Sequence, residues 1–487
     1  MFDKIKELTK DTVIYGISTI VGRFLNFLLV PFYTNVFEPR DVGIYSNIYA
    51  YIAFLNVVFI YGMDAAFMKY NSAAADKDKK LTYSTAYLFL TITSLILSAL
   101  LYLGKDGMIR LMEIPNTYEH LYNYLIFIIL FDTLAIVPFA NLRLQRKSLK
   151  FTLIKLGNIS LNILLNLVLV LKLKMDIEAI FIANLAASAF SFIVLLPDIY
   201  KNFEFRIDGG YLKLMLKFAI PYLPASMAAT LVQVVDRPIV LALTDEKTLG
   251  IYQASYKLGI FMMLIVQMFQ FAWQPFLLIN SKEENAKEIF SKVLTLFLIA
   301  ASLMWIVLSL FIEDIATIRF WGGVSLIGYK YWSGLAIVPI ILLAYIFHGM
   351  YVNFQAGLYI EEKTKYFPIV TGSGALVNIV SNFLLIPFWG IMGAALATLF
   401  SYITMALALF YFSQKVYRIK YEYGKIARLM SLVFSSSVAY YLLYYNGILN
   451  IPIKILLLFV FVTILFIAKI VDINELSVLT KRLVKRK

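Results

Sequence analysis

The chain has 487 residues, of which 61% are hydrophobic and only 15% are charged. Soluble domains average about 45–50% apolar and about 25% charged residues, so this composition excludes an ordinary soluble protein and predicts a membrane protein. The net charge of +14 does not by itself indicate nucleic acid binding, because the basic residues follow a membrane topology. There is no cysteine and there are only two histidines, which excludes disulfides, thiolate metal sites and a histidine-rich metal site.

Apolar runs long enough to cross a bilayer follow one another along the chain. A hydrocarbon core about 30 Å thick needs helices of roughly 20 apolar residues, since lipid offers no partner for a backbone N–H or C=O. The runs predict an all-α polytopic membrane protein of about fourteen transmembrane helices. In chain order they cover residues 12–36, 42–62, 84–103, 121–141, 151–171, 177–199, 218–243, 249–279, 293–312, 334–355, 367–386, 390–412, 429–445 and 451–470.

The segment before the seventh span has a different pattern. Residues 204–217 are amphipathic and predict an interfacial piece. Pro221 and Pro224 then fall where the seventh helix is expected to open, a position that tolerates proline.

The distribution of Lys and Arg predicts the orientation. With the N-terminus placed in the cytoplasm, the cytoplasmic segments hold 31 of these residues and the opposite face holds 9. This excess predicts that both termini lie in the cytoplasm. No small-residue cleavage site follows a short apolar core at the N-terminus, so we do not expect a removable signal peptide.

Two parts of the chain repeat. Gly-Ile-Tyr occurs at residues 43–45 and again at 250–252, displaced by 207 residues, and an Asn-x-x-x-Asn pair at 162–166 recurs at 378–382, displaced by 216. Each displacement spans six predicted helices, an even number, which predicts two parallel repeats with a cavity between them. The predicted parts are an N-lobe over residues 1–202, a C-lobe over 203–414, and helices 13–14 with a basic cytoplasmic tail over 415–487.

These residues resemble a known family. Arg23 in the first span, Pro-Arg-Asp-Val-Gly-Ile-Tyr at 39–45, and Val-Asp-Arg at 235–237 followed by Gly-Ile-Tyr at 250–252 resemble the polysaccharide transporter family. These are the oligosaccharide flippases of the multidrug/oligosaccharidyl-lipid/polysaccharide (MOP) exporter superfamily. The resemblance extends over essentially the whole chain.

The resemblance implies a function. Similar proteins move undecaprenyl-diphosphate-linked oligosaccharide repeat units across the bacterial inner membrane by alternating access, for the synthesis of O-antigen, capsule or exopolysaccharide. The implied partners are this lipid-linked oligosaccharide and membrane lipids, with a polysaccharide polymerase and a chain-length regulator as further candidates. No cofactor and no nucleic acid is expected, and transport coupled to an H⁺ or Na⁺ gradient is a further expectation.

Four basic residues lie inside the predicted spans and are assigned to neither membrane face. A charge at mid-membrane costs at least about 2.5–3.5 kcal/mol, so it needs a partner, water or a function. For a lipid diphosphate, the candidate anion contacts are Arg23, Lys257, Lys155 and Arg237. The alternative for each is an ion pair or snorkelling to the interface.

Acids and amides in the spans complete the candidate set. Asp132, Asp64 and Asp236 are candidates to bind Na⁺ or a proton, although a structural pairing is favoured for Asp64. In the eighth span, amides and an indole at helical spacing predict a saccharide-lined surface, or else interhelical hydrogen bonding. These residues are Gln267, Gln270, Gln274 and Trp273.

Three rival functions remain open. A multidrug or ion antiporter of the same superfamily would be expected to carry acids in the first lobe, whereas the first helix carries Arg23. A flippase for the peptidoglycan lipid precursor would be expected to have more cavity arginines. An integral-membrane sugar polymerase is less favoured, because the longest outer loops, 104–120 and 313–333, show no catalytic arrangement.

Overall fold

The computed structural model describes residues 20–281, 283–319 and 323–471. Contacts among the helices divide the chain into two compact units. The first unit holds the described residues up to Lys257 together with 327–334 and 367–401, and the second holds the remainder. These borders differ from those of the predicted lobes, and the division into lobes stays a prediction.

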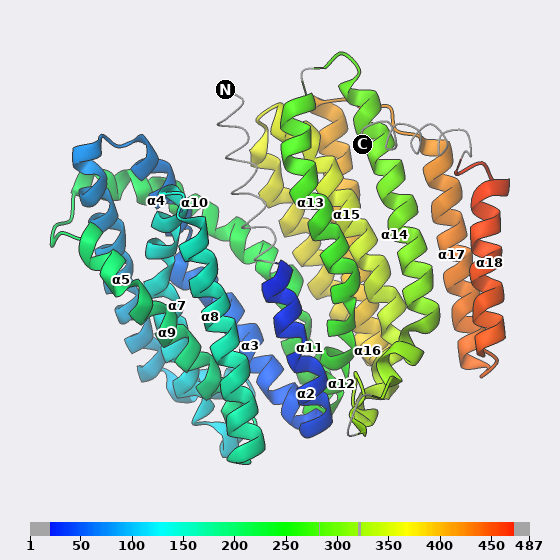
Figure 1. Cartoon of the computed structure of the whole chain (residues 1–487), viewed down its shortest axis with the longest axis horizontal. Coiled ribbons are helices and arrows are strands. Elements are labelled where there is room, and N and C mark those ends of the chain that lie inside the picture. Colours follow the sequence, from blue (N-terminus) through cyan, green and yellow to red (C-terminus); the bar gives the residue numbers. More distant parts are fainter. Residues whose placement is uncertain (1–19, 282, 320–322, 472–487) are drawn as a thin grey trace. The chain divides into compact units, whose positions relative to one another are not determined.

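The first unit contains most of the N-terminal half of the chain (Figure 1). Its helices are α2 (Leu29–Val36), α3 (Pro39–Ile60), α4 (Met63–Ala73), α5 (Lys79–Leu103), α6 (Lys105–Leu111), α7 (Leu121–Leu144), α8 (Ser148–Leu167), α9 (Glu178–Asn202), α10 (Gly209–Val234), α11 (Asp236–Leu243) and α12 (Glu246–Tyr256). The second unit contains α13 (Ile260–Asn280), α14 (Ala286–Thr317), α15 (Val338–Ile360), α17 (Tyr423–Tyr445) and α18 (Ile451–Ile467). Helix α16 (Phe367–Val416) begins in the first unit and ends in the second.

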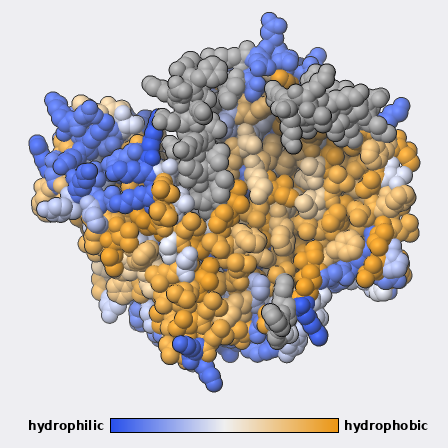
Figure 2. All heavy atoms as spheres, viewed as in Figure 1, coloured by the Kyte–Doolittle hydropathy of each residue, from blue (hydrophilic) through white to orange (hydrophobic). Residues whose placement is uncertain are grey.

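The described helices confirm the predicted fold class. Eleven of them are long and apolar enough to cross a membrane, and two shorter apolar helices cover Ile20–Val36 and Ile451–Ile467. Apolar side chains cover the middle of the helices in Figure 2, whereas hydrophilic ones gather toward their ends. On α5, for example, Ile96 is 54% exposed and Leu100 is 58% exposed, as expected for side chains that face lipid. The chain is an all-α, multi-pass membrane protein.

Helix α16 is a helical hairpin that accounts for two predicted spans. Gly390 has φ 52° and ψ −133°, a backbone conformation that glycine adopts without steric cost. The chain reverses there. The reversal brings Gly393 so close to Leu385 that a Cβ on the glycine would lie 2.5 Å from the Leu385 backbone. Farther along, the Ser401 hydroxyl donates to the Gly374 carbonyl at 2.8 Å. The expected loop between the eleventh and twelfth spans is therefore a tight turn.

Two other predicted spans are broken. The eighth, 249–279, divides into α12 and α13 at residues 257–259, and the seventh divides into α10 and α11 at Val235. The second, 42–62, is α3, which ends before Tyr61 and Gly62, both of positive φ, and α4 follows as a helix that the predicted span did not include. Pro238 has no N–H to donate to the carbonyl four residues earlier, which explains the interruption just before Asp236.

Part of the predicted interfacial piece, residues 204–217, is continuous with the seventh span. Asp208 caps α10 by accepting the Tyr211 N–H at 2.8 Å, so residues 209–217 belong to the same helix as the span, and their position at the membrane interface stays a prediction. Pro221 and Pro224 consequently lie inside α10 and do not open it. The sequence pattern missed this start because the capping Asp lies before two glycines, which are poor helix formers.

Helix α10 begins against the helices that precede it in the first unit. The buried side chains of this cluster come from α4, α5, α7 and α10. They are Met63, Ala66, Phe67, Tyr83, Ala86, Leu90, Val137, Ala140, Met215 and Ala219. Backbone N–H groups before α10 also donate to α5, from Glu204 to the Ser84 hydroxyl and from Asp208 to the Thr85 hydroxyl.

The predicted Gly-Ile-Tyr repeats contact each other. A Cβ on Gly43 of α3 would lie 1.8 Å from the Glu246 carbonyl oxygen, and a Cβ on Gly250 of α12 would lie 1.8 Å from the Pro39 carbonyl oxygen. Each glycine thus meets the repeat equivalent of the other's partner, at the same displacement of 207 residues. Such reciprocity is the signature of a local two-fold relation between the repeats.

The Asn pairs form the same hydrogen bonds in both repeats. On α8, the Asn166 amide donates to the Asn162 carbonyl at 2.9 Å, and on α16 the Asn382 amide donates to the Asn378 carbonyl at 2.8 Å. The first pair has an additional partner, since the Tyr33 hydroxyl donates to Asn166 Oδ1 at 2.8 Å. In the second pair, Asn382 Oδ1 is buried and has no hydrogen-bond partner among the described residues.

The residues between α14 and α15 help to close one end of the first unit. Gly328 donates its N–H to the Thr34 hydroxyl at 3.1 Å, and the Tyr331 hydroxyl donates to the Phe37 carbonyl at 2.9 Å. Lys330 forms an ion pair with Glu38. The segment 327–334 therefore joins the end of α2 and the start of α3.

The glycine contact yields a stability prediction. Gly43→Ala or Gly250→Ala places a methyl group 1.8 Å from a backbone oxygen, so α3 and α12 must separate, and overpacking of this kind costs about 1–3 kcal/mol. We expect a lower midpoint of thermal unfolding for either variant in detergent. The control is Gly372→Ala on α16, where no atom lies within 4 Å of the added Cβ. Unchanged unfolding of both test variants would show that the helices do not meet at these glycines.

Candidate functional site

Lys257 is a membrane-embedded cation held by a tyrosine. It follows α12, and its Nζ donates to the Tyr45 hydroxyl at 3.1 Å while lying 5.4 Å from the centre of the Tyr45 ring. Tyr45 is the last residue of the first Gly-Ile-Tyr repeat, and α12 carries the second. The close approach of Gly43 and Gly250 therefore brings these two side chains together.

No carboxylate balances the Lys257 charge among the described residues. Two other lysines of limited exposure have one: Lys454 Nζ lies 2.5 Å from Asp314 Oδ2, and Lys150 Nζ lies 2.5 Å from Asp198 Oδ2. For Lys257 the described contacts are the hydroxyl and the aromatic face of Tyr45, both of which stabilise a cation without neutralising it. The side chain is half-buried and so remains accessible. An anionic ligand would neutralise the Lys257 ammonium, which no described carboxylate does.

A chain of polar side chains continues from Tyr45 into α9. Tyr49 lies one turn farther along α3, and the two ring centres are 6.1 Å apart. The Asn184 amide of α9 donates to the Tyr49 hydroxyl at 2.8 Å. The Ser188 hydroxyl lies between the Asn184 amide oxygen, at 3.4 Å, and the Asp132 carboxylate of α7.

The far end of this chain is a second lysine. Lys155 on α8 interacts electrostatically with Asp132, and its Nζ lies 4.2 Å from the centre of the Phe139 ring. The side chain of Lys155 is nevertheless exposed. The structure thus connects three of the residues that the sequence singled out, Lys257, Asp132 and Lys155. We call the connected series the polar track; its members are Lys257, Tyr45, Tyr49, Asn184, Ser188, Asp132 and Lys155.

Asp236 and Arg237 begin α11 and form a second group in the first unit. Asp236 is only 3% exposed, and one of its oxygens accepts a hydrogen bond from Tyr252 at 2.6 Å. Its other oxygen is buried and has no partner among the described residues, and the same holds for Nε of Arg237. The Tyr252 hydroxyl is also within hydrogen-bonding reach of Thr398 on α16. Tyr252 is the repeat equivalent of Tyr45, so both Gly-Ile-Tyr motifs direct a phenol to a charged group.

Arg23 and Asp64 lie on other helices of the first unit. Arg23 is exposed on the helix Ile20–Val36, and a Cβ on the preceding Gly22 would lie 2.9 Å from Ile159 of α8. Asp64 lies in the first turn of α4, and its Oδ2 is 3.9 Å from Nη2 of Arg143. A carboxylate at a helix N-terminus beside an arginine needs no ion-coupling role to explain it.

The predicted saccharide residues belong to α13 in the second unit. Gln267 and Gln270 are half-buried, whereas Trp273 is 3% exposed and packs against Phe269, Phe276 and Phe290. The Gln274 side chain lies outside the described residues. Aromatic packing accounts for the burial of the Trp273 ring, whereas its Nε1 is buried without a hydrogen-bond partner among the described residues. A saccharide contact by these four residues stays a prediction.

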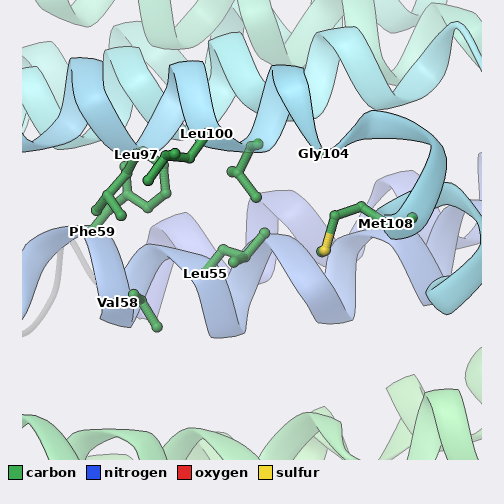
Figure 3. A pocket seen from close by; sticks show the side chains of 9 residues that line it. Leu55, Val58, Phe59, Leu97, Leu100, Gly104 and Met108 are labelled. Atoms are coloured by element: carbon green, nitrogen blue, oxygen red, sulfur yellow. The ribbon is translucent and has the colours of Figure 1, made fainter.

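Two crevices in the first unit contain none of the predicted residues. One, of about 340 Å³, lies between α3, α5 and α6 and is lined by apolar side chains, including Leu55, Phe59 and Met108 (Figure 3). It offers no charge to an anion. The other, of about 320 Å³, is polar and lies at the ends of α4, α5, α7 and α9. The polar track, by contrast, combines two cations, Lys257 and Lys155, with hydrogen-bonding groups inside the spans.

Sequence reasoning missed Tyr45, Tyr49 and Asn184. The signal for Tyr45 was present, because the Gly-Ile-Tyr repeat ends on it. For Tyr49 the sequence held only the spacing of four residues from Tyr45, which places both on one helix face. Nothing distinguished Asn184 from the other amides in the spans.

Comparison with known proteins agrees with this architecture. A family model described as "Polysaccharide biosynthesis protein" matches residues 8–279. The Lsg locus putative protein 1 of Haemophilus influenzae is 20% identical over 403 residues, which cover 79% of this chain and 94% of the relative.

Solved structures share the fold. The lipid II flippase MurJ in an inward closed conformation superposes with a TM-score of 0.73 and 20% identity, over 94% of this chain and 100% of that one. An inward-facing multidrug resistance MATE family transporter of the MOP superfamily gives a TM-score of 0.66 and 12% identity, over 81% of this chain and 94% of that one. With its family model spanning more than half of its length, this chain belongs to the polysaccharide biosynthesis protein family, and it has the fold of the MOP superfamily of membrane transporters.

Proposed function

We propose that this protein is a flippase for undecaprenyl-diphosphate-linked oligosaccharide repeat units. It would move them from the cytoplasmic to the outer leaflet of the bacterial inner membrane, with both of its termini in the cytoplasm. Membership of the polysaccharide biosynthesis family and the fold shared with a lipid II flippase support a lipid-linked cargo. Transport by this fold involves no bond-breaking step, so the protein is not proposed to be an enzyme.

Lys257 is the observation that carries this proposal. A cation inside a membrane span without a carboxylate partner is costly unless an anion or water completes it. A lipid diphosphate supplies such an anion, and it carries its own apolar tail in the bilayer. Arg23, exposed on the first described helix, and Lys155 and Arg237 are further candidate contacts along the path of the diphosphate.

Alternating access requires that one end of the protein close while the other opens. In the predicted topology, Glu38 and Lys330 lie on the outer side, where the segment 327–334 joins α2 and α3. We propose that these contacts close the outer side and separate when the cargo is released.

Asp236 is the proposed site of ion coupling. A carboxylate that is 3% exposed, with one unpartnered oxygen among the described residues, is poised to bind Na⁺ or a proton. The Tyr252 hydroxyl and the nearby Thr398 hydroxyl supply further oxygens of the kind that Na⁺ binds. Asp236 interacts electrostatically with Arg237, as Asp132 does with Lys155 and Asp64 with Arg143, and its unpartnered oxygen is what sets it apart.

A second candidate is a flippase for the peptidoglycan lipid precursor. The structural similarity to the lipid II flippase MurJ, with its TM-score of 0.73, favours it over a multidrug antiporter. The two flippase functions share the diphosphate site and differ in the sugar that follows it.

Deletion of the gene tests the cargo. We expect lipid-linked repeat units to accumulate and surface polysaccharide to be lost, because the oligosaccharide stays on the cytoplasmic leaflet. Lys257→Gln and Arg23→Ala should fail to restore surface polysaccharide at unchanged protein level, and Lys257→Arg should restore it in part. Intact polysaccharide in the deletion strain would contradict the proposal. Rescue of cells depleted of their lipid II flippase would instead support the second candidate.

Ion coupling is tested at Asp236. Asp236→Asn cannot carry the negative charge, so we expect loss of surface polysaccharide and, for Na⁺ coupling, loss of ²²Na⁺ binding to the purified protein. Asp64→Asn is the matched control and should retain both, because its ion pair at 3.9 Å is partly exposed and contributes little. Full activity of Asp236→Asn would remove this residue from the coupling step.

Alternating access is tested by a cross-link. Because the chain contains no cysteine, Glu38→Cys combined with Lys330→Cys introduces the only two thiols. Both native side chains are partly exposed, at 59% and 37%, so a thiol reagent can reach the pair. Bridging the two thiols with a short bis-methanethiosulfonate reagent should stop transport and reductant should restore it, whereas each single variant should be insensitive to the bridging. Undiminished transport by the cross-linked protein would show that this contact need not open.

A further inference from the structure

Tyr49 and Asn184 form a partly exposed hydrogen-bonding pair next to the lysine assigned to the diphosphate. Tyr49 is four residues after Tyr45 on α3, and Tyr45 accepts the hydrogen bond of Lys257. Asn184, on α9, donates to the Tyr49 hydroxyl at 2.8 Å. Tyr45 itself is 6% exposed, whereas Tyr49 and Asn184 are half-buried, so this pair is not sealed in the core.

The pair has unused hydrogen-bonding capacity. The Tyr49 hydroxyl accepts from Asn184, and its own proton has no acceptor among the described residues. Asn184 Nδ2 carries two protons, of which one is used by Tyr49 in the part of the chain that the structure describes. Its Oδ1 receives only the long 3.4 Å contact from Ser188.

A neighbouring amide shows what a purely structural role looks like. Asn158 on α8 directs Nδ2 to the Ala187 carbonyl at 2.6 Å and to the Ser191 hydroxyl at 2.9 Å, which fixes α8 against α9. Both of its protons are therefore used between two packed helices. The Tyr49–Asn184 pair differs in having donors left over.

The chemistry of these groups matches a sugar. A pyranose presents hydroxyls that donate and accept hydrogen bonds and C–H faces that pack on aromatic rings, and binding sites use a few placed polar groups among aromatic ones. Tyr49 offers both kinds of contact, with Phe181 packed 5.2 Å from its ring centre to hold it in place. In a diphosphate-linked oligosaccharide the first sugar is bonded directly to the phosphate, so it must lie beside the cation that binds the anion.

We infer that Tyr49 and Asn184 form the subsite for the first sugar residue of the cargo, next to the diphosphate held at Lys257. This inference rests on the proposed flippase function and adds to it the residues that recognise the saccharide. It also assigns the sugar contact to α3 and α9 of the first unit, independently of the glutamines of α13. The unused protons of Tyr49 and Asn184 donate to the sugar oxygens.

Binding of two lipids to the purified protein in nanodiscs tests this subsite. One probe is undecaprenyl diphosphate without sugar, and the other is the lipid-linked oligosaccharide extracted from the deletion strain. Wild-type protein should bind the glycosylated lipid more tightly. Tyr49→Phe and Asn184→Ala should each weaken that binding by about threefold to tenfold, the effect of one lost hydrogen bond, while leaving undecaprenyl diphosphate unaffected.

Two controls make the result decisive. Asn158→Ala removes an amide of the same type and should leave the ratio of the two affinities unchanged, and Lys257→Gln should weaken both lipids equally. Equal weakening of both lipids by Tyr49→Phe and Asn184→Ala, or unchanged affinity for the glycosylated lipid, would overturn the subsite while the flippase function stands. If wild-type protein binds neither lipid, the proposed function fails and the subsite with it.

Discussion

The backbone contact between α3 and α12 sets the geometry of the site. With no side chain on Gly43 or Gly250, each helix lies directly on a carbonyl of the other, at a distance where any Cβ would overlap an oxygen. Tyr45 and Lys257 meet because they follow these glycines by two and seven residues on helices locked in this register. The first polar group of the track therefore depends on the absence of two methyl groups.

Most of the fold was predictable because lipid imposes a simple rule on the sequence. Spans must be apolar and about 20 residues long, so their number and order follow from hydropathy. What hydropathy does not encode is how a span ends or breaks. The start of α10 at Gly209 depends on a hydrogen bond from Tyr211 to Asp208, and the end of the second span, where α3 is followed by α4, depends on the positive φ of Tyr61 and Gly62. The break before α11 differs from these, because it can be predicted from the residue type: Pro238 has no N–H to continue the hydrogen bonding of the helix.

The candidate site was predictable only in its charges. A lysine or aspartate inside a span is rare enough to stand out, which is why Lys257, Lys155, Asp132 and Asp236 were found. Tyrosine is not rare here, with 33 in the chain, so neither Tyr45 nor Tyr49 was distinguished by type. Pairing is also non-local: Asn184 reaches Tyr49 across 135 positions of sequence. Trp273 illustrates the converse, because aromatic spacing on one helix cannot reveal that Phe290 of the next helix covers it.

The two Asn pairs show how repeats diverge without changing shape. Both keep the same bond between an amide and a carbonyl one turn earlier, so the helices α8 and α16 are alike at this point. Only the first acquired a phenol, Tyr33, that fills the remaining acceptor. The second pair therefore keeps one buried acceptor, Asn382 Oδ1, without a hydrogen-bond partner among the described residues. One hydroxyl from a neighbouring side chain would satisfy this atom, as Tyr33 does in the first pair, without any change in the backbone of α16.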